Sequence, residues 1–155
     1  LRTWTMQGMW IFLTSVSGIT AICSRNIIDP GAYFYIGCAL WIFGFSFESI
    51  SDYQKRKFKV QNPDSFISTG LWSLSRHPNY FGEIVLWFGI TIIAFPALQG
   101  YQYFSLISPI FVFWLLTKVS GIPILERHAD ETWGSQEDYK TYKESTPVLF
   151  PKFFK

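Results

Sequence analysis

The sequence predicts an all-α, polytopic integral membrane protein with about four transmembrane helices. Only 15% of its residues are charged, against roughly 25% in a soluble domain. Three stretches without Asp, Glu, Lys or Arg stand out: 22 residues between Arg2 and Arg25, 18 between Asp29 and Glu48, and 34 between Glu83 and Lys118. A helix needs about 20 residues to cross the hydrocarbon at a rise of ~1.5 Å each. These lengths disfavour the alternative, a soluble and densely aromatic α-protein.

Each uncharged stretch predicts one or two spans. The first two correspond to helices over residues 4–24 and 31–50. The third holds two short helices, 80–97 and 102–119, joined by a turn at Pro96 and Gly100. We expect one membrane domain over residues 1–155, with polar segments 51–79 and 120–155 outside the bilayer. Because the chain enters a span directly from Leu1 without a signal-peptide pattern, we also expect it to be the C-terminal part of a longer protein.

The distribution of cations predicts the orientation. With four spans, 12 of the 13 Lys and Arg residues lie on one side and Arg25 alone lies on the other. This asymmetry places the polar segments in the cytoplasm, at either the endoplasmic reticulum membrane or a bacterial inner membrane. A formal net charge of +2 is too small to indicate nucleic-acid binding, so the lipid bilayer is the expected partner. No CxxC motif or His/Cys cluster predicts a metal site.

The second span continues into a charged helix. Its charged residues recur at three- and four-residue spacing and therefore share one face: Glu48, Asp52, Lys55, Arg56 and Lys59. Two interpretations are open. Asp52 and Arg56 can form an ion pair worth about 0.3–0.5 kcal/mol. Alternatively the face binds a ligand, with Asp52 accepting hydrogen bonds and the cations, Lys59 among them, meeting phosphate.

Residues 61–64 end the helix, and residues 66–74 form an amphipathic segment that we expect in the membrane interface, with Trp72 at that depth.

The next segment concentrates polar side chains at the start of the third span. A helix is predicted to begin near Pro78, where its free N–H groups carry partial positive charge. Arg76 and His77 stand beside that end and predict an anion site. Asn79 and Glu83 are four residues apart on one face, and the Asn79 amide can bind another amide through donor and acceptor. An ionised Glu83 at membrane depth needs a partner, which we expect to be Arg76, His77 or a ligand. The alternative is a positively charged anchor for the helix.

The C-terminal tail is polar again. Glu126 and Arg127 follow the fourth span, and Ser135 with Asp138 predicts a capping box that opens a short helix. Tyr139 and Tyr142 are three residues apart on this helix and can face the same groove. Ligand contact and packing onto the membrane surface are both open for the two rings.

These motifs resemble a known superfamily. The run Arg76-His77-Pro78-Asn79-Tyr80, followed by Gly82-Glu83, is similar to the motif shared by steroid 5-alpha-reductase-like proteins, sterol reductases and isoprenylcysteine carboxyl methyltransferases. Residues 48–59, 70–72, 121–126 and 146–147 are most similar to the reductase-like DUF1295 branch of the 5-alpha-reductase group. The resemblance covers nearly the whole chain from Ala39 onward. It implies a membrane-embedded, NADPH-dependent reductase of a conjugated double bond in a lipid or sterol-like hydrophobic small molecule.

The resemblance also implies which residues bind NADPH. They are Asp52, Lys59, Arg76, His77, Asn79, Tyr80, Glu83, Glu126, Arg127, Tyr139 and Tyr142. Cations and the helix end would meet the pyrophosphate and the 2′-phosphate, while Asn79 and Glu83 would hold the nicotinamide amide. In the 5-alpha-reductases the acid that polarises the substrate lies N-terminal to the matched region, so no catalytic residue is assigned. Neither a GxGxxG unit nor a GxxxxGK[ST] loop occurs to bind the cofactor in another way.

Two alternatives remain at this stage. An S-adenosylmethionine-dependent methyltransferase of the isoprenylcysteine carboxyl methyltransferase type shares the RHPxY string. Those methyltransferases typically carry paired glutamates in the tail, whereas here Arg127 follows Glu126. S-adenosylmethionine also has no phosphates for the cations to neutralise. A non-catalytic membrane scaffold would explain the missing substrate acid but leaves Glu83 at membrane depth without a purpose.

Overall fold

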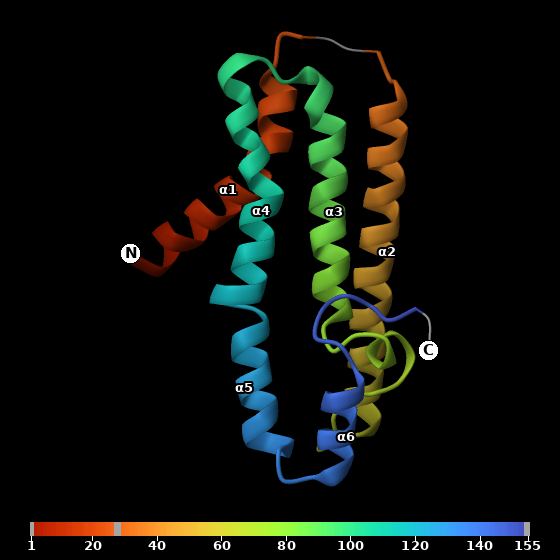
Figure 1. Ribbon diagram of the computed structural model, residues 1–155. Helices are drawn as coiled ribbons and strands as arrows, with labels where there is room; N and C mark the ends of the chain where they lie inside the picture. The colour runs from red at the N-terminus through yellow and green to blue at the C-terminus, as the bar shows by residue number, and fades with distance from the viewer. Residues whose placement is uncertain (1, 27–28, 154–155) are drawn as a thin grey trace. The chain divides into compact units, whose positions relative to one another are not determined.

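The computed structural model describes residues 2–26 and 29–153. Their regular secondary structure is all helical, with no β-strand among them, as predicted (Figure 1). The α-helices are α1 (Arg2–Cys23), α2 (Ala32–Gln61), α3 (Pro78–Ala94), α4 (Ile107–Trp114), α5 (Ile122–Trp133) and α6 (Glu137–Ser145). Three 3-10 helices, η1 (Gly70–Ser73), η2 (Phe95–Ala97) and η3 (Gly100–Leu106), lie between them, and a π-helical turn, η4 (Leu115–Val119), follows α4.

Among the described residues, four helical stretches are long and apolar enough to cross a membrane. They are Trp4–Cys23, Ala32–Gln61, Pro78–Ala97 and Gly100–Trp133. In the first, only 6% of the most apolar window is buried within the protein, so its apolar side chains face outward. Such a surface is costly in water and suits a lipid environment. The finding confirms the predicted fold class and is compatible with an integral membrane protein.

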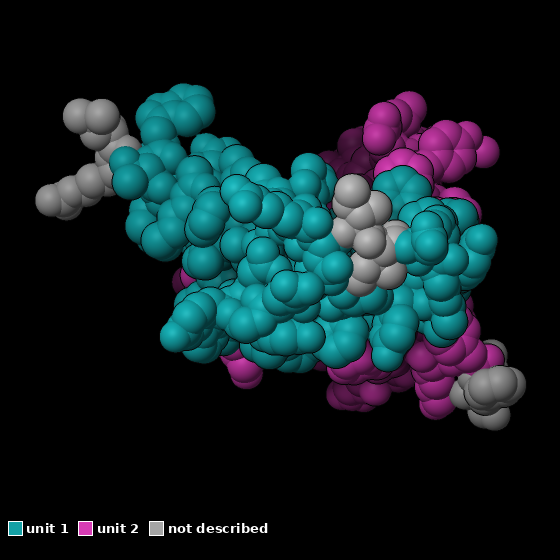
Figure 2. Space-filling view, turned by 90° about the horizontal axis from the view of Figure 1, so that it is seen from above, with its two compact units in different colours: residues 1–43, 84–115 teal, residues 44–83, 116–155 magenta. Residues whose placement is uncertain are grey.

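The chain groups into two compact units, coloured separately in Figure 2. Unit 1 comprises residues 1–43 and 84–115, and unit 2 comprises residues 44–83 and 116–155. Helices α2 and α3 each contribute their apolar part to unit 1 and their polar end to unit 2. All of the residues predicted to bind a cofactor belong to unit 2.

Small residues and hydroxyl groups hold unit 1 together. A Cβ placed on Gly37 would lie 2.7 Å from the Gly89 carbonyl oxygen, so α2 and α3 approach at backbone distance there. The buried hydroxyls of Ser17 and Thr91 are 3.2 Å apart and hydrogen-bonded. Close backbone contact and hydroxyl bonds are the usual means of packing helices in lipid, where apolar burial adds little.

Unit 2 shows the same close approach between the polar ends of α2 and α3. A Cβ on Gly82 would lie 2.6 Å from the Glu48 backbone nitrogen and 2.7 Å from the Gly44 oxygen. The neighbouring η1 is fixed to α2 because the Trp72 indole N–H donates to the Ser51 carbonyl at 2.9 Å. Gly70, which begins η1, has φ +64°, a conformation that glycine adopts at little cost.

Two local predictions are wrong. Trp72 is only 4% exposed and its N–H bonds to protein, so the ring packs inside unit 2 instead of lying in the membrane interface. The capping box of Ser135 and Asp138 does not form. Helix α6 begins at Glu137 behind Gln136, which makes no side-chain capping bond. The helix therefore starts too late for Ser135 to cap it, and the acidic Glu137 and Asp138 complement the helix dipole instead.

The contact at Gly82 yields a stability prediction. Gly82→Ala should lower the unfolding free energy by about 1–3 kcal/mol, because the added methyl meets backbone atoms that cannot rotate away. Gly8→Ala is the matched control, since nothing lies within 4 Å of the added Cβ. Thermal melting of the detergent-purified variants checks this, and equal melting temperatures for the two would contradict it.

Candidate functional site

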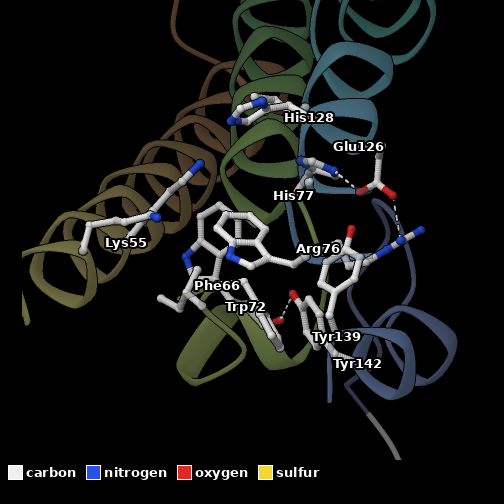
Figure 3. Close-up of a pocket in the computed structure, with 14 residues that line it drawn as sticks. Lys55, Phe66, Trp72, Arg76, His77, Glu126, His128, Tyr139 and Tyr142 are labelled. Carbon is white, nitrogen blue, oxygen red and sulfur yellow. Dashed lines mark hydrogen bonds and ion pairs between the residues drawn. The ribbon is translucent and has the colours of Figure 1, made fainter. Parts of the chain in front are cut away.

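A cavity of about 230 Å³ lies within unit 2 (Figure 3). Its walls come from the polar end of α2, the segment around η1, the residues just before α3, and helices α5 and α6. The lining residues are Lys55, Lys59, Phe66, Ile67, Trp72, Arg76, His77, Leu125, Glu126, His128, Ala129, Trp133, Tyr139 and Tyr142. Segments distant in sequence thus form one site.

One part of the lining is a cluster of aromatic rings. The Phe66 ring lies 5.5 Å from Tyr142, nearly parallel to it at 30°, and 5.3 Å from Tyr139 at a steep angle. The Tyr142 hydroxyl donates to the Trp72 carbonyl at 2.7 Å, drawn as a dashed line in Figure 3. Mutually packed rings form a rigid wall, which suits a flat ring or an apolar group of a ligand.

Another part of the lining is polar: a carboxylate with two basic partners. Glu126 Oε2 lies 2.7 Å from the Arg76 guanidinium, and Glu126 Oε1 lies 2.7 Å from His77 Nε2 (Figure 3). The side chains are 10%, 6% and 19% exposed for Arg76, His77 and Glu126, so little water screens the contacts. The sequence predicts that the partner of Glu83 is Arg76, His77 or a ligand. In the described residues their carboxylate partner is Glu126, and Glu83 makes no ion pair.

His77 is held on several sides but retains one unused atom. It directly precedes α3, its carbonyl accepts the Phe81 N–H at 3.2 Å, and its ring stacks on Tyr80 at 5.7 Å. With Nε2 bonded to Glu126, Nδ1 is buried and has no hydrogen-bond partner within the described part of the chain. Buried polar atoms are usually paired. Nδ1 is therefore a candidate contact for a ligand.

Two lysines on α2 bring positive charge to the cavity. Lys55 Nζ lies 4.9 Å from the centre of the Trp72 ring, and Lys59 Nζ lies 4.9 Å from that of Trp133. Neither lysine pairs with a carboxylate among the ion pairs of residues 2–26 and 29–153, and the Asp52–Arg56 pair is not formed there either. Because Glu126 already neutralises Arg76, the two lysines favour an anionic ligand.

The tyrosines of α6 present neutral phenols. Burial, reinforced by the charge of Asp130 and a 3.1 Å hydrogen bond to it, raises the pKa of Tyr139 to about 12. Burial also raises the pKa of Tyr142 above its ordinary value. Lys143 pairs with the same Asp130 oxygen and so holds the carboxylate that Tyr139 contacts. Both tyrosines therefore remain protonated at physiological pH.

The structure divides the predicted cofactor residues into two groups. Those that line the cavity are Lys59, Arg76, His77, Glu126, Tyr139 and Tyr142, and those that do not are Asp52, Asn79, Tyr80, Glu83 and Arg127. Arg127 is exposed on α5. The carboxylates of Asp52 and Glu83 lie near that of Glu48, where α2 and α3 approach, and repel its charge.

Several lining residues were not among the predicted cofactor residues. Lys55 was placed on the candidate ligand face, four residues before Lys59, but was not named as a cofactor contact. Phe66, Trp133 and His128 carry no local signal, since what places them at the cavity is contact between distant segments. Trp72 was interpreted as a membrane-surface residue and instead forms part of the wall.

The family follows from a comparison with family models. The model of DUF1295, described as a protein of unknown function, matches residues 1–146. The chain belongs to the DUF1295 family. This is a family of steroid 5-alpha-reductase-like proteins, which confirms the resemblance seen in the sequence. The match includes every residue that lines the cavity of this DUF1295 protein. No curated protein and no solved structure matches the chain significantly.

The Glu126 contacts predict a stability difference between two carboxylates. Glu126→Gln should lower the unfolding free energy by about 1–3 kcal/mol, because Arg76 loses the charge that compensates it at a largely buried site and the His77 ring loses a hydrogen bond to a carboxylate. Glu137→Gln is the control: its pair with Lys140 is exposed, and such pairs contribute roughly 0–1 kcal/mol. Thermal melting measures both, and an equal loss in the two variants would contradict the prediction.

The raised pKa of Tyr139 predicts a loss of stability at high pH. In the unfolded chain a tyrosine ionises near pH 10. Since the pKa of folded Tyr139 is about 12, its contribution is complete below about pH 10 and is lost as the pH rises toward 12. Tyr139→Phe should therefore flatten the fall in melting temperature over this range. Tyr101→Phe is the control, because Tyr101 is 89% exposed, and it should leave the dependence of melting temperature on pH unchanged. Identical pH dependences for the two variants would refute the raised pKa of Tyr139.

Proposed function

We propose that this DUF1295 protein binds NADPH at the cavity of unit 2 and reduces a conjugated double bond of a lipid or sterol-like molecule. The observation that carries the proposal is the combination of an aromatic wall with two lysines, Lys55 and Lys59, that lack carboxylate partners among the described ion pairs. A nucleotide cofactor offers a flat base that can pack on the aromatic wall and phosphates that can bind the two lysines. Membership in a steroid 5-alpha-reductase-like family supports the reaction class.

The cavity fits one part of such a cofactor. Its volume of about 230 Å³ is below the roughly 300–1,000 Å³ of pockets that hold whole drug-sized ligands. An open groove of about 530 Å³, which Arg76 also lines, carries Lys143 and Lys152. A base in the cavity with phosphates reaching toward Lys55, Lys59 and the groove would use both the small volume and the charge.

Asn79 and Glu83 remain the predicted contacts of the nicotinamide amide. The Asn79 Oδ1 atom is buried without a hydrogen-bond partner in the described residues. An amide N–H of the ligand would satisfy it, and Glu83, one helical turn further along α3, can accept a second N–H. Neither residue lines the aromatic cavity, so this role requires the cofactor to extend beyond it.

The protein's part in the reaction would be binding and orientation. When bound, NADPH supplies a hydride for the double bond. Arg76 and His77 are fixed by Glu126 before any ligand arrives, so the remaining N–H groups of Arg76 and the Nδ1 atom of His77 need little reorganisation to meet a ligand. The phenol of Tyr139 stays neutral and contributes no negative charge beside an anionic ligand.

S-adenosylmethionine fits the same cavity less well. Its sulfonium would profit from an open aromatic face, but lysine ammonium groups already lie over the Trp72 and Trp133 rings. Those lysines would also repel a cationic ligand. The charge of the cavity therefore favours the phosphate-bearing cofactor.

A thermal titration with NADPH, NADH and S-adenosylmethionine tests the proposal. The melting temperature of the detergent-purified protein should rise with NADPH concentration, because only ligands of the folded state stabilise it. Replacing Lys55 and Lys59 together by Gln should weaken NADPH binding at least roughly tenfold. Lys57→Gln is the matched control, since Lys57 is exposed on the same helix and does not line the cavity.

The other outcomes decide against the proposal. Stabilisation by S-adenosylmethionine alone would identify a methyltransferase. No response to any of the three ligands, from intact protein, would favour a non-catalytic scaffold. An equal loss of NADPH affinity in the Lys57 control would show that overall charge, and not the cavity, governs binding.

A further inference from the structure

A non-helical segment after α6 runs beside the residues that carry Arg76 and His77. We name residues 146–152 the C-terminal strap. The Arg76 N–H donates to the Pro147 carbonyl at 2.9 Å and the His77 N–H to the Val148 carbonyl at 3.1 Å, while the Lys152 N–H donates to the Leu74 carbonyl at 2.9 Å. Three backbone bonds therefore join the strap to residues 74–77.

Ser75 is the side chain that links the two segments. It is fully buried, and its hydroxyl donates to the Leu149 carbonyl at 2.8 Å. The Ser75 hydroxyl oxygen in turn accepts the His77 backbone N–H at 3.2 Å. Leu149 is 7% exposed and anchors the strap through its side chain, while Pro147 and Pro151 have no N–H to satisfy. A single hydroxyl thus bonds both the strap and the backbone of His77.

These bonds act on the two basic residues of the site. Arg76 and His77 immediately precede α3, so their backbone N–H groups have no helical acceptors and depend on the strap and Ser75. The direction of their side chains follows from that backbone, and both side chains must reach Glu126 at 2.7 Å. A shift of the backbone would change how the pair faces the cavity.

We propose that Ser75 is a positioning residue, and that Ser75 and the C-terminal strap together hold Arg76 and His77 in the orientation in which both contact Glu126 and line the ligand cavity. The inference rests on the proposed function only for the identity of the ligand. The orientation of the His77 ring does not depend on what the cavity binds.

Two pairs of variants isolate the bonds. Ser75→Ala removes the linking hydroxyl, and Ser73→Ala is its control because the Ser73 hydroxyl is exposed and bonds only within η1. Lys152→Pro removes the N–H that donates to Leu74. Lys152→Ala keeps that N–H and removes the same charge, so the comparison separates the backbone bond from the lysine side chain.

The first measurement needs no ligand. The chain has two histidines, His77 and His128, so the imidazole NMR signals of histidine-labelled protein in detergent can be assigned with His128→Asn. Ser75→Ala and Lys152→Pro should shift the His77 signals relative to wild type while His128 stays in place, and Ser73→Ala and Lys152→Ala should shift neither. Unmoved His77 signals in both test variants of folded protein would overturn the proposal, whether or not NADPH binds.

The second measurement is the dissociation constant for NADPH, taken well below the melting temperature of each variant. Ser75→Ala should raise it roughly three- to tenfold, the effect of one misplaced hydrogen-bonded contact, and Ser73→Ala should leave it within about twofold. Lys152→Pro should raise it beyond the value for Lys152→Ala. Normal affinity together with moved His77 signals would make the strap purely structural and overturn its role at the cavity. A wild type that binds no NADPH would refute the proposed function, and the His77 signals would still decide whether the strap positions the ring.

Discussion

The arrangement of the site depends on one carboxylate holding two basic side chains that come from another part of the chain. Glu126 on α5 contacts Arg76 and His77, which precede α3, and all three side chains are largely buried. A buried carboxylate without partners would be strongly destabilising, and the same holds for a buried guanidinium. The three groups are therefore stable only together, which forces α5 to pack where the cavity can form between it, α2 and α6.

The polar site is compatible with a membrane protein because α2 and α3 change character along their length. Each begins or ends in an apolar stretch that belongs to unit 1 and has a charged end in unit 2. At Gly82 the backbones approach so closely that even a methyl group would not fit, and further along α2 Lys55 and Lys59 line the cavity. The same helices thus supply both the apolar surface and the charged lining.

The parts of this architecture that the sequence predicts are those encoded locally. Long uncharged runs predict the spans, and Pro78 marks the start of α3 because proline is favoured at that position. Arg76 and His77 were identified as site residues because they adjoin that helix end. Their partner was not, since Glu83 is near in sequence whereas Glu126 is near only after α5 has packed. The same reason explains Trp72: an indole suits a membrane surface equally well, and only the contact with Ser51 distinguishes the two places.

The charge of the cavity bears on its ligand more directly than its shape does. An aromatic wall accepts a nicotinamide, an adenine or a purely apolar group, so the rings alone leave the ligand class open. The lysines over Trp72 and Trp133 pack against the rings and also bring their charge to the cavity wall. The Lys59 ammonium contacts a ring and the Pro63 carbonyl, and no carboxylate within the described residues forms an ion pair with it or with Lys55. Positive charge at a cavity wall with no carboxylate in direct ion-pair contact is stabilised by an anion that arrives from outside, which is the reason a phosphate-bearing cofactor suits this site better than a cationic one.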